Sequence, residues 1–161
     1  MVYSAQQSVI YGSHGVCTIL QIEEKCVDRK MVQYYVLEPL LQPGTKYFVP
    51  VHNALAVGKI RLPMDHKEIR TLVENQTADM TCWIESENQR KLRYRELLGN
   101  CDPKALFCML RVLRQHRQEQ LAQGRKFHVC DANFLKDGEN LLANEIAFVL
   151  GIDKADALNM I

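Results

Sequence analysis

The pattern of hydrophobic and polar positions changes near residue 64. Before that point, short runs of β-branched and aromatic residues alternate with turn residues, a pattern typical of β-strands. After it, apolar residues recur every three or four positions, which predicts amphipathic helices. The strand-like runs occupy residues 8–24, 31–37 and 46–51. The sequence therefore predicts an α+β chain in which a small β unit precedes an all-α helical bundle.

Turn residues separate the strand-like runs. Gly12 and Gly15 flank His14 where the first hairpin turn is expected, because glycine readily adopts the positive φ angles of tight turns. Residues 28–30 and 42–45 mark two further turns. Three or four strands at this spacing predict a small, strongly bent antiparallel barrel. His14 has no carboxylate or nucleophile at motif spacing, so a structural role in the turn is favoured over general-base chemistry.

Start and stop signals divide the second half into helices. Asp65 is a plausible N-cap for a short helix, and residues 74–80 are interpreted as a linker. A long helix is expected from Glu85 to Leu98, with Gly99 and Asn100 as its left-handed cap.

The next predicted helix begins at Asp102-Pro103 and ends at residues 123–124, with a buried stripe of leucine and methionine. The last long helix is expected to be capped by Asp131 and closed by Gly151, and a short helix over 153–160 completes the bundle. Gly138 interrupts the pattern of that long helix, at an expected cost of about 1 kcal/mol relative to alanine.

Composition permits either one medium domain or two small ones, because 47% of the 161 residues are hydrophobic. The formal net charge of +1 identifies no polyanionic partner by itself. The charge is unevenly distributed, however. Residues 83–128 carry ten basic against five acidic residues, residues 129–161 carry two against six, and residues 1–82 carry eight of each. The positive excess is therefore local to the start of the helical half.

The six cysteines form no C-x-x-C pair and show no regular spacing, so they are interpreted as reduced thiols, with no metal site. No N-terminal apolar segment and no apolar run approaching 18 residues is present, so we expect a cytoplasmic protein without a membrane span. The chain also lacks a phosphate-binding glycine loop, a nucleophile elbow and a paired-carboxylate motif. We therefore expect no catalytic residues, no cofactor and no small-molecule substrate. The alternative is a small enzyme with an unrecognised site, which would show catalytic turnover of its own.

Several short segments, taken in order, resemble the CarD/CdnL family of bacterial transcription regulators. No single segment is specific for this family. Their shared order is specific, however, and together they span almost the whole chain. They are Tyr11–Val16, Ile22-Glu23, Tyr34–Leu37, Phe48–Val51 and Ile60-Arg61, followed by Trp83–Glu85, Arg90-Lys91, Arg125-Lys126, Phe134–Lys136, Leu141-Leu142 and Ala147–Ile152.

The resemblance implies three parts: a Tudor-like RNA-polymerase-interacting barrel over 1–64, a short helix and linker over 65–82, and a helical DNA-contacting domain over 83–161. It implies a regulator that binds the β subunit of bacterial RNA polymerase and promoter DNA just upstream of the melted region, stabilising the open complex. The main alternative is a polymerase-binding module without DNA contact, as in the transcription-repair coupling factor. That protein is a translocase, and no helicase motif is present here.

Basic residues and the only tryptophan supply the candidate DNA contacts. Arg111, Arg114 and Arg117 recur every three residues, and Arg90 to Arg95 crowd the preceding helix. A solvated charged face is the ordinary explanation, but the scarcity of acidic residues and the resemblance favour phosphate contact that is largely sequence-independent. A lone tryptophan is usually a packing anchor, whereas the resemblance implies a minor-groove wedge. The expected DNA-contacting residues are Trp83, Arg90, Lys91, Arg93, Arg111 and Arg114.

The strand near residue 48 and the turn near Lys25 supply the candidate polymerase contacts that the resemblance implies. Addition of a partner strand to an edge would let so small a barrel bind a large protein. The alternative is an ordinary edge strand protected by Pro50. The expected polymerase-contacting residues are Lys25, Tyr47, Phe48, Val49 and Pro50.

Overall fold

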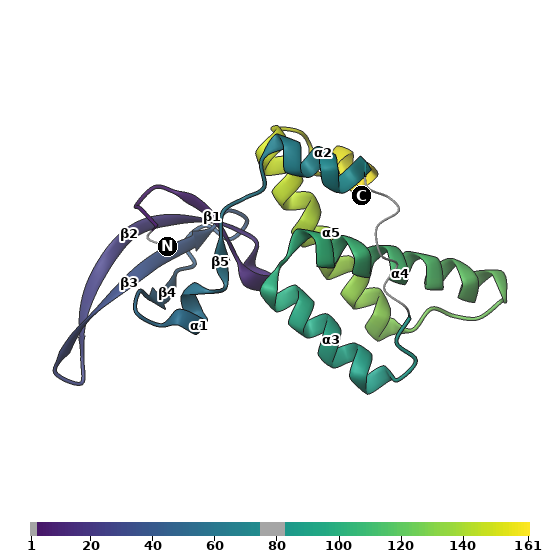
Figure 1. Cartoon of the computed structure of the whole chain (residues 1–161), viewed down its shortest axis with the longest axis horizontal. Helices are drawn as coiled ribbons and strands as arrows, with labels where there is room; N and C mark the ends of the chain where they lie inside the picture. Colours follow the sequence, from purple (N-terminus) through teal and green to yellow (C-terminus); the bar gives the residue numbers. More distant parts are fainter. Residues whose placement is uncertain (1–2, 75–82) are drawn as a thin grey trace. The chain divides into compact units, whose positions relative to one another are not determined.

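The computed structural model describes residues 3–74 and 83–161, and the chain divides into two compact units, Met1–Pro63 and Met64–Ile161. The first unit is an antiparallel sheet of five strands, and the second is helical (Figure 1). The predicted α+β class and the order of its parts are confirmed. Of the predicted linker over residues 74–80, Glu74 is the last residue of α2, and residues 75–80 lie outside the described residues.

The strands of the first unit lie in the order β4-β3-β2-β1-β5, so β4 and β5 form the edges of the sheet. A register shift between Ile19 and Gln21 bends the long β2–β3 hairpin. The fifth strand has only two residues, too few for a period-two pattern to reveal it. The bounds are β1 Ser8–Tyr11, β2 Val16–Val27, β3 Lys30–Pro39, β4 Tyr47–Pro50 and β5 Ile60–Arg61, with the short helix α1 at Ala54–Val57.

The predicted turns are present where the strands connect. A single 3-10 turn, Gly12–His14, joins β1 to β2, with positive φ angles of 46° at Gly12 and 71° at Gly15. Asp28 and Arg29, with φ of 50° and 62°, form the two-residue connection between β2 and β3. Two consecutive residues in the left-handed conformation give a turn whose twist matches the right-handed twist of the flanking strands. This conformation allows a connection of only two residues.

Alternate residues of the strands build the core of the first unit. The phenol of Tyr3 donates a 2.8 Å hydrogen bond to the carbonyl oxygen of Ile60, and its ring lies edge-on to the buried ring of Tyr35. Burial raises the pKa of the Cys17 thiol to about 12, which keeps this side chain an unreactive thiol. The buried cluster is Tyr3, Val9, Cys17, Ile19, Tyr35, Leu37, Val49 and Ile60.

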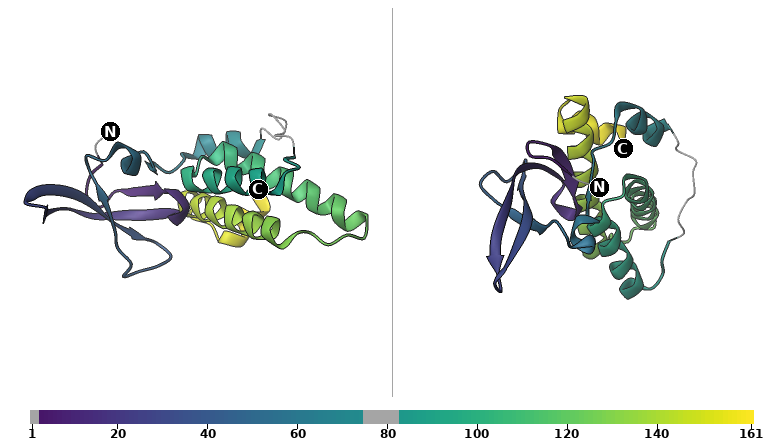
Figure 2. Two further views of the ribbon diagram at one scale, coloured as in Figure 1. Left: turned by 90° about the horizontal axis from the view of Figure 1, so that it is seen from below. Right: turned by 60° about the vertical axis from the view of Figure 1, so that its left-hand side comes forward.

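The second unit contains five helices in its described residues, and α3, α4 and α5 pack side by side in it (Figure 2). The predicted apolar stripe of α4 forms the centre of its core, with Leu106, Met109, Leu110 and Leu113 at most 2% exposed. The helix α2 packs on α4 and α5, and α6 packs on α5. The bounds are α2 His66–Glu74, α3 Glu87–Asn100, α4 Pro103–Ala122, α5 Val129–Leu150 and α6 Lys154–Met160.

Three predicted helix caps are confirmed. The amide of Glu68 donates to the carboxylate of Asp65 at 2.7 Å while the Glu68 carboxylate accepts from the Asp65 amide at 2.8 Å, a capping box for α2. The carboxylate of Asp102 accepts from the Ala105 amide at 2.8 Å, ahead of a proline in the first turn of α4. Gly151 ends α5 in the left-handed conformation.

Two predicted caps are wrong. Gly99 lies inside α3, and the residue that ends this helix with a left-handed conformation is the buried Cys101, at φ 51°. The helix α5 starts two residues before Asp131, and its N-cap is His128, whose Nδ1 accepts a hydrogen bond from the Cys130 amide. Asp131 instead lies within the first turn of α5, where its carboxylate accepts hydrogen bonds from an arginine on α3.

Gly138 has a packing role between α4 and α5. A Cβ atom at this position would lie 2.9 Å from both Leu110 Cδ2 and Met109 Cε. The glycine therefore lets the two helices approach closely, which offsets its low helix propensity.

Candidate functional site

The edge strand β4 presents its residues alternately to the outer face and to the core. Phe48 is 42% exposed on the outer face, whereas Val49 is 1% exposed and belongs to the core. Pro50 lies on the same face as Phe48, opposite Tyr34 in the register with β3. Of the predicted polymerase contacts, Val49 can therefore reach a partner only through its backbone.

Side chains from three neighbouring strands meet around Phe48. The ammonium of Lys25, on β2, lies 3.5 Å from the centroid of the Phe48 ring, a cation–π contact. The ring of Tyr34, on β3, lies edge-on to Phe48 with centroids 6.4 Å apart. We call Lys25, Tyr34 and Phe48 the Phe48 patch. Sequence reasoning missed Tyr34, although it follows from the shared period-two alternation of β3 and β4.

His14 packs within an aromatic group beside the first turn. Its ring centroid lies 4.1 Å from that of Tyr47 and 5.3 Å from that of Tyr11. Desolvation, with a smaller contribution from the charge of Lys59, lowers the pKa of His14. These contacts support the structural interpretation of His14, and they show that Tyr47 is partly engaged within the unit.

Trp83 contacts two elements of the helical unit. Its indole stacks on the ring of His116, on α4, with centroids 3.5 Å apart and planes 16° apart. The guanidinium carbon of Arg90, on α3, lies 4.3 Å from the indole centroid. Trp83 remains half-buried, so part of its ring is accessible. The predicted wedge residue is thus held in a fixed position.

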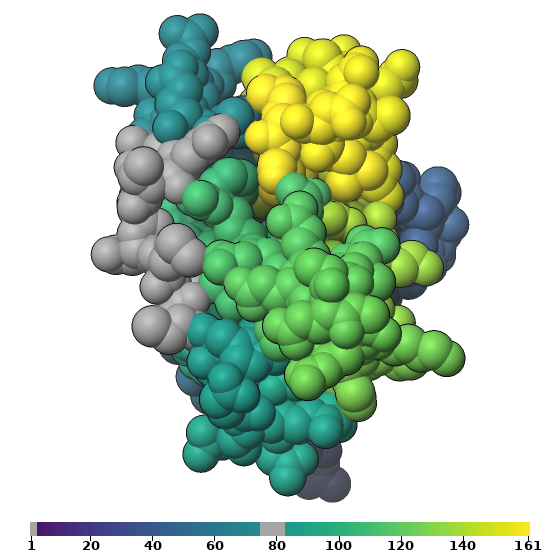
Figure 3. Space-filling view, turned by 90° about the vertical axis from the view of Figure 1, so that its right-hand side faces the viewer, coloured from purple at the N-terminus to yellow at the C-terminus, as the bar shows by residue number. Residues whose placement is uncertain are grey.

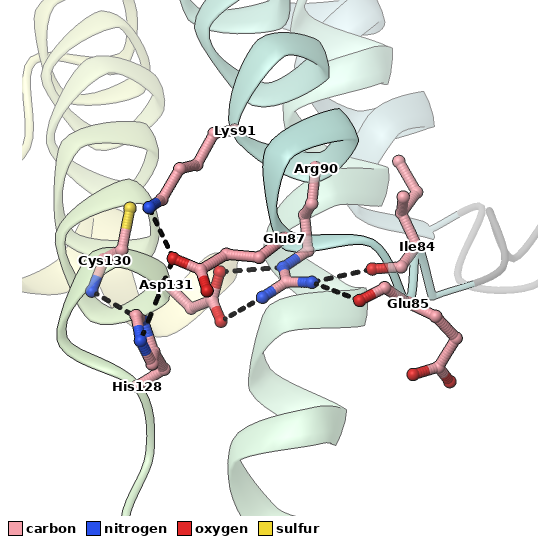
Figure 4. Close-up of polar contacts among 8 residues, drawn as sticks. All are labelled: Ile84, Glu85, Glu87, Arg90, Lys91, His128, Cys130 and Asp131. Atoms are coloured by element: carbon pink, nitrogen blue, oxygen red, sulfur yellow. Dashed lines mark hydrogen bonds and ion pairs between the residues drawn. The ribbon is translucent and has the colours of Figure 1, made fainter.

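Arg90 lies inside the helical unit, which corrects its predicted place on a DNA-facing surface. It is 6% exposed, and its Nε and Nη2 donate to the two carboxylate oxygens of Asp131 at 2.9 Å each (Figure 4). Its Nη1 donates to the carbonyl oxygens of Ile84 and Glu85 at 2.7 and 3.3 Å. The hydrogen bonds to Asp131 raise the pKa of Arg90. Arg90 is therefore a positioning residue for Trp83 and for the backbone that precedes α3.

The other predicted basic residues are distributed over α3 and α4. Lys91 pairs with Glu87, and Arg93 pairs with Glu96 at 2.9 Å, both along exposed turns of α3. Such surface pairs contribute little stability, so these cations remain available to a phosphate.

The two predicted DNA-contacting arginines on α4 are Arg111 and Arg114. Arg114 donates to Glu139 at 2.7 and 3.0 Å and also to the carbonyl oxygen of Ile161, linking α4 to α5 and to the last residue. Arg111 is half-buried. The structure therefore brings Trp83 and Arg90 together but does not gather all six predicted residues on one face.

Residues 3–64 match the family model of the CarD-like/TRCF RID domain. The first unit is thus similar to the domain that this family model describes, which supports an RNA polymerase-interacting module in this part of the chain. This match confirms the resemblance seen in the sequence of this part of the chain. Residues 65–161 lie outside the matched segment. A comparison with curated proteins finds no match.

The matched segment contains all five predicted polymerase-contacting residues, and its sheet presents the Phe48 patch beside one edge. The predicted DNA-contacting residues all lie in the helical unit, outside the RID domain. The support that His116 and Asp131 give to Trp83 was missed because neither residue is close to Trp83 or Arg90 in sequence.

No three His, Cys, Asp or Glu side chains among residues 3–74 and 83–161 come together as a metal site would require. In the same part of the chain, no helix is long and apolar enough to cross a bilayer. Five described cysteines are free thiols, and the sixth, Cys82, lies outside the described residues.

Proposed function

We propose that this chain is a non-enzymatic, cytoplasmic regulator of bacterial transcription initiation. Its RID domain docks on the β subunit of RNA polymerase, and its helical unit contacts promoter DNA at the upstream edge of the melted region. The observation that carries the proposal is the Phe48 patch beside an edge strand, within a domain of an RNA polymerase-interacting family.

Docking on the polymerase uses the edge of β4. On the side away from β3, the backbone groups of an edge strand are available to a partner strand, and alternate side chains provide selection. Phe48 and Pro50 project from the outer face beside this edge. Lys25 above Phe48 adds a cation whose attraction to the ring strengthens when a partner excludes water. Apolar contact around Phe48 therefore adds to the affinity that the backbone groups supply.

DNA contact uses Trp83 and the neighbouring cations of the helical unit. An apolar ring that enters the minor groove unstacks a base step, and nearby cations hold the flanking phosphates. Because His116 and Arg90 hold the indole in place, little side-chain entropy is lost when it inserts. Lys91, Arg93, Arg111 and Arg114 supply positive charge without base-specific geometry, so binding is largely independent of sequence.

The regulatory effect follows from a difference in affinity. A wedge at the edge of melted DNA binds the kinked, opened duplex better than the closed duplex. The open complex is then stabilised by the difference between these two binding free energies, and equal affinity for both states would shift nothing. Whether a given promoter is activated or repressed depends on which step limits its transcription.

A footprint of the promoter complex tests the DNA contact directly. Hydroxyl-radical cleavage would be compared for polymerase alone, polymerase with the chain, and polymerase with Trp83→Ala. We expect new protection at the upstream edge of the bubble, weakened by the substitution. Polymerase binding with an unchanged footprint would instead establish the alternative function, a polymerase-binding module without DNA contact.

A further inference from the structure

A cavity of about 320 Å³ lies where α4 ends and α5 begins. Its wall includes the apolar side chains of Leu121, Phe127 and Leu135. The surface of α4 and of its connection to α5 faces the viewer in Figure 3. The volume is at the lower end of the roughly 300–1,000 Å³ range of small-molecule sites, so the cavity suits a ligand of about one nucleotide.

The polar residues around this cavity give it a positive character. Arg117 and Lys136 line it, both are exposed, and neither forms an ion pair with any of the described residues. Glu139 also lines it, but Arg114 holds its carboxylate through two hydrogen bonds. The exposed cations Arg117 and Lys136 therefore lie beside the apolar part of the cavity wall. Among the described lining residues the acidic one is Glu139, and Arg114 already neutralises it.

An aromatic series connects the cavity to Trp83. The centroid of the half-buried Phe127 ring lies 6.4 Å from that of His116, and His116 stacks on Trp83. A strand that leaves the duplex at Trp83 would thus find a second aromatic ring close by. Aromatic faces beside cations are the usual composition of surfaces that bind single-stranded nucleic acid.

We propose that this cavity binds one nucleotide of single-stranded DNA, with the base against Phe127 and the adjacent phosphates on Arg117 and Lys136. The inference rests on the proposed function, because a wedge at Trp83 would unpair bases next to the cavity. A free nucleotide has the same chemistry. We favour a DNA strand because Arg125 and Lys126, exposed in the α4–α5 connection, extend the positive charge beyond a single phosphate.

The test measures binding of a fluorescent single-stranded octanucleotide to the full chain without polymerase, by anisotropy at low salt. Phe127→Ala is expected to weaken binding roughly tenfold, because a base loses its stacking partner. Its matched control is Phe148→Ala, an exposed phenylalanine near the other end of α5, which should leave binding unchanged. Since Phe127 is half-buried, circular dichroism would check that the variant folds.

A surface variant keeps the test independent of folding. Arg117→Glu should weaken oligonucleotide binding and flatten its salt dependence, whereas Lys104→Glu, at the start of the same helix, should do neither. If a mononucleotide competes as well as the octanucleotide, the ligand is a free nucleotide and the DNA assignment is overturned. Equal binding by wild type, Phe127→Ala and Arg117→Glu would overturn the site itself.

The two proposals fail in different ways. If the octanucleotide binds at the cavity but the chain has no effect on promoter complexes, the proposed function fails while the site survives. If the chain extends the lifetime of promoter complexes and Phe127→Ala does so equally well, the proposed function survives and the nucleotide site is refuted.

Discussion

Arg90 and Asp131 form a two-point hydrogen-bonded ion pair, with both N–H···O distances 2.9 Å, that joins α3 to α5 across 41 positions of sequence. The same guanidinium lies over the indole of Trp83. A contact that stabilises the helical unit therefore also determines where its only tryptophan lies.

Removal of one partner of this pair should be costly. Asp131→Ala leaves the Arg90 guanidinium buried without its counter-charge, and we expect the free energy of unfolding to fall by about 3–5 kcal/mol. Urea unfolding followed by Trp83 fluorescence measures the change. The matched control is Glu96→Ala, which removes the exposed partner of Arg93 and should cost less than about 1 kcal/mol. Equal effects of the two substitutions would contradict the structural role of the pair.

The stacking of Trp83 on His116 predicts a spectroscopic effect. His116→Ala exposes one face of the indole, so the fluorescence emission should shift to longer wavelength and quenching by acrylamide should increase. Because the chain has one tryptophan, the signal has a single source. His52→Ala, in the first unit, is the control and should leave both observables unchanged. An unaltered spectrum in His116→Ala would show that the rings do not stack in solution.

The Phe48 patch predicts the residue on which polymerase binding depends most. Phe48→Ala should weaken binding of the full chain to RNA polymerase by about tenfold or more, as expected for an aromatic residue central to an interface. Leu55→Ala is the control, because Leu55 is a more exposed apolar side chain, 85% exposed, on α1 of the same unit. Surface plasmon resonance with immobilised polymerase compares them. If Leu55→Ala lost more affinity for polymerase than Phe48→Ala, the interface would not be centred on β4.

The packing of His14 predicts a pH dependence. Its pKa is lower in the folded protein than the ordinary value of 6.5, so below that value the unfolded chain binds the proton more readily. The contribution of neutral His14 to stability is complete above the ordinary pKa and is lost as the pH falls through it. Urea midpoints followed by circular dichroism should fall as the pH drops from 6.5 toward the lower pKa of folded His14, and less so in His14→Gln. Identical slopes in the wild type and in His14→Gln would refute the assignment.

The features that the sequence predicted correctly depend on local contacts. The caps at Asp65 and Asp102 join residues three positions apart. Gly151 adopts the left-handed conformation at the end of α5 because glycine has no Cβ atom. The period-two alternation of a strand also separates the exposed Phe48 from the buried Val49, a distinction that the prediction of four consecutive contact residues did not make. Chemistry of this kind can be recognised without knowing the fold.

The features that the sequence did not reveal depend on contacts between distant segments. Asp131 has the chemistry of an N-cap, and its actual partner, Arg90, lies 41 positions away on another helix. Likewise, the cation–π contact between Lys25 and Phe48 depends on the pairing of β2 with β3, where a register shift after Ile19 changes which residues face each other. Neither the hydrophobic period of a segment nor its secondary-structure propensity shows how it pairs with a distant segment.

We propose that the chain stabilises open promoter complexes through Trp83. The most direct measurement is the lifetime of the open complex formed by bacterial RNA polymerase, with no addition, with the wild-type chain and with Trp83→Ala. We expect the wild-type chain to lengthen this lifetime and the Trp83→Ala variant to return it toward the value for polymerase alone. An equal effect of both proteins would assign Trp83 to packing alone, and no effect together with no polymerase binding would contradict the account as a whole.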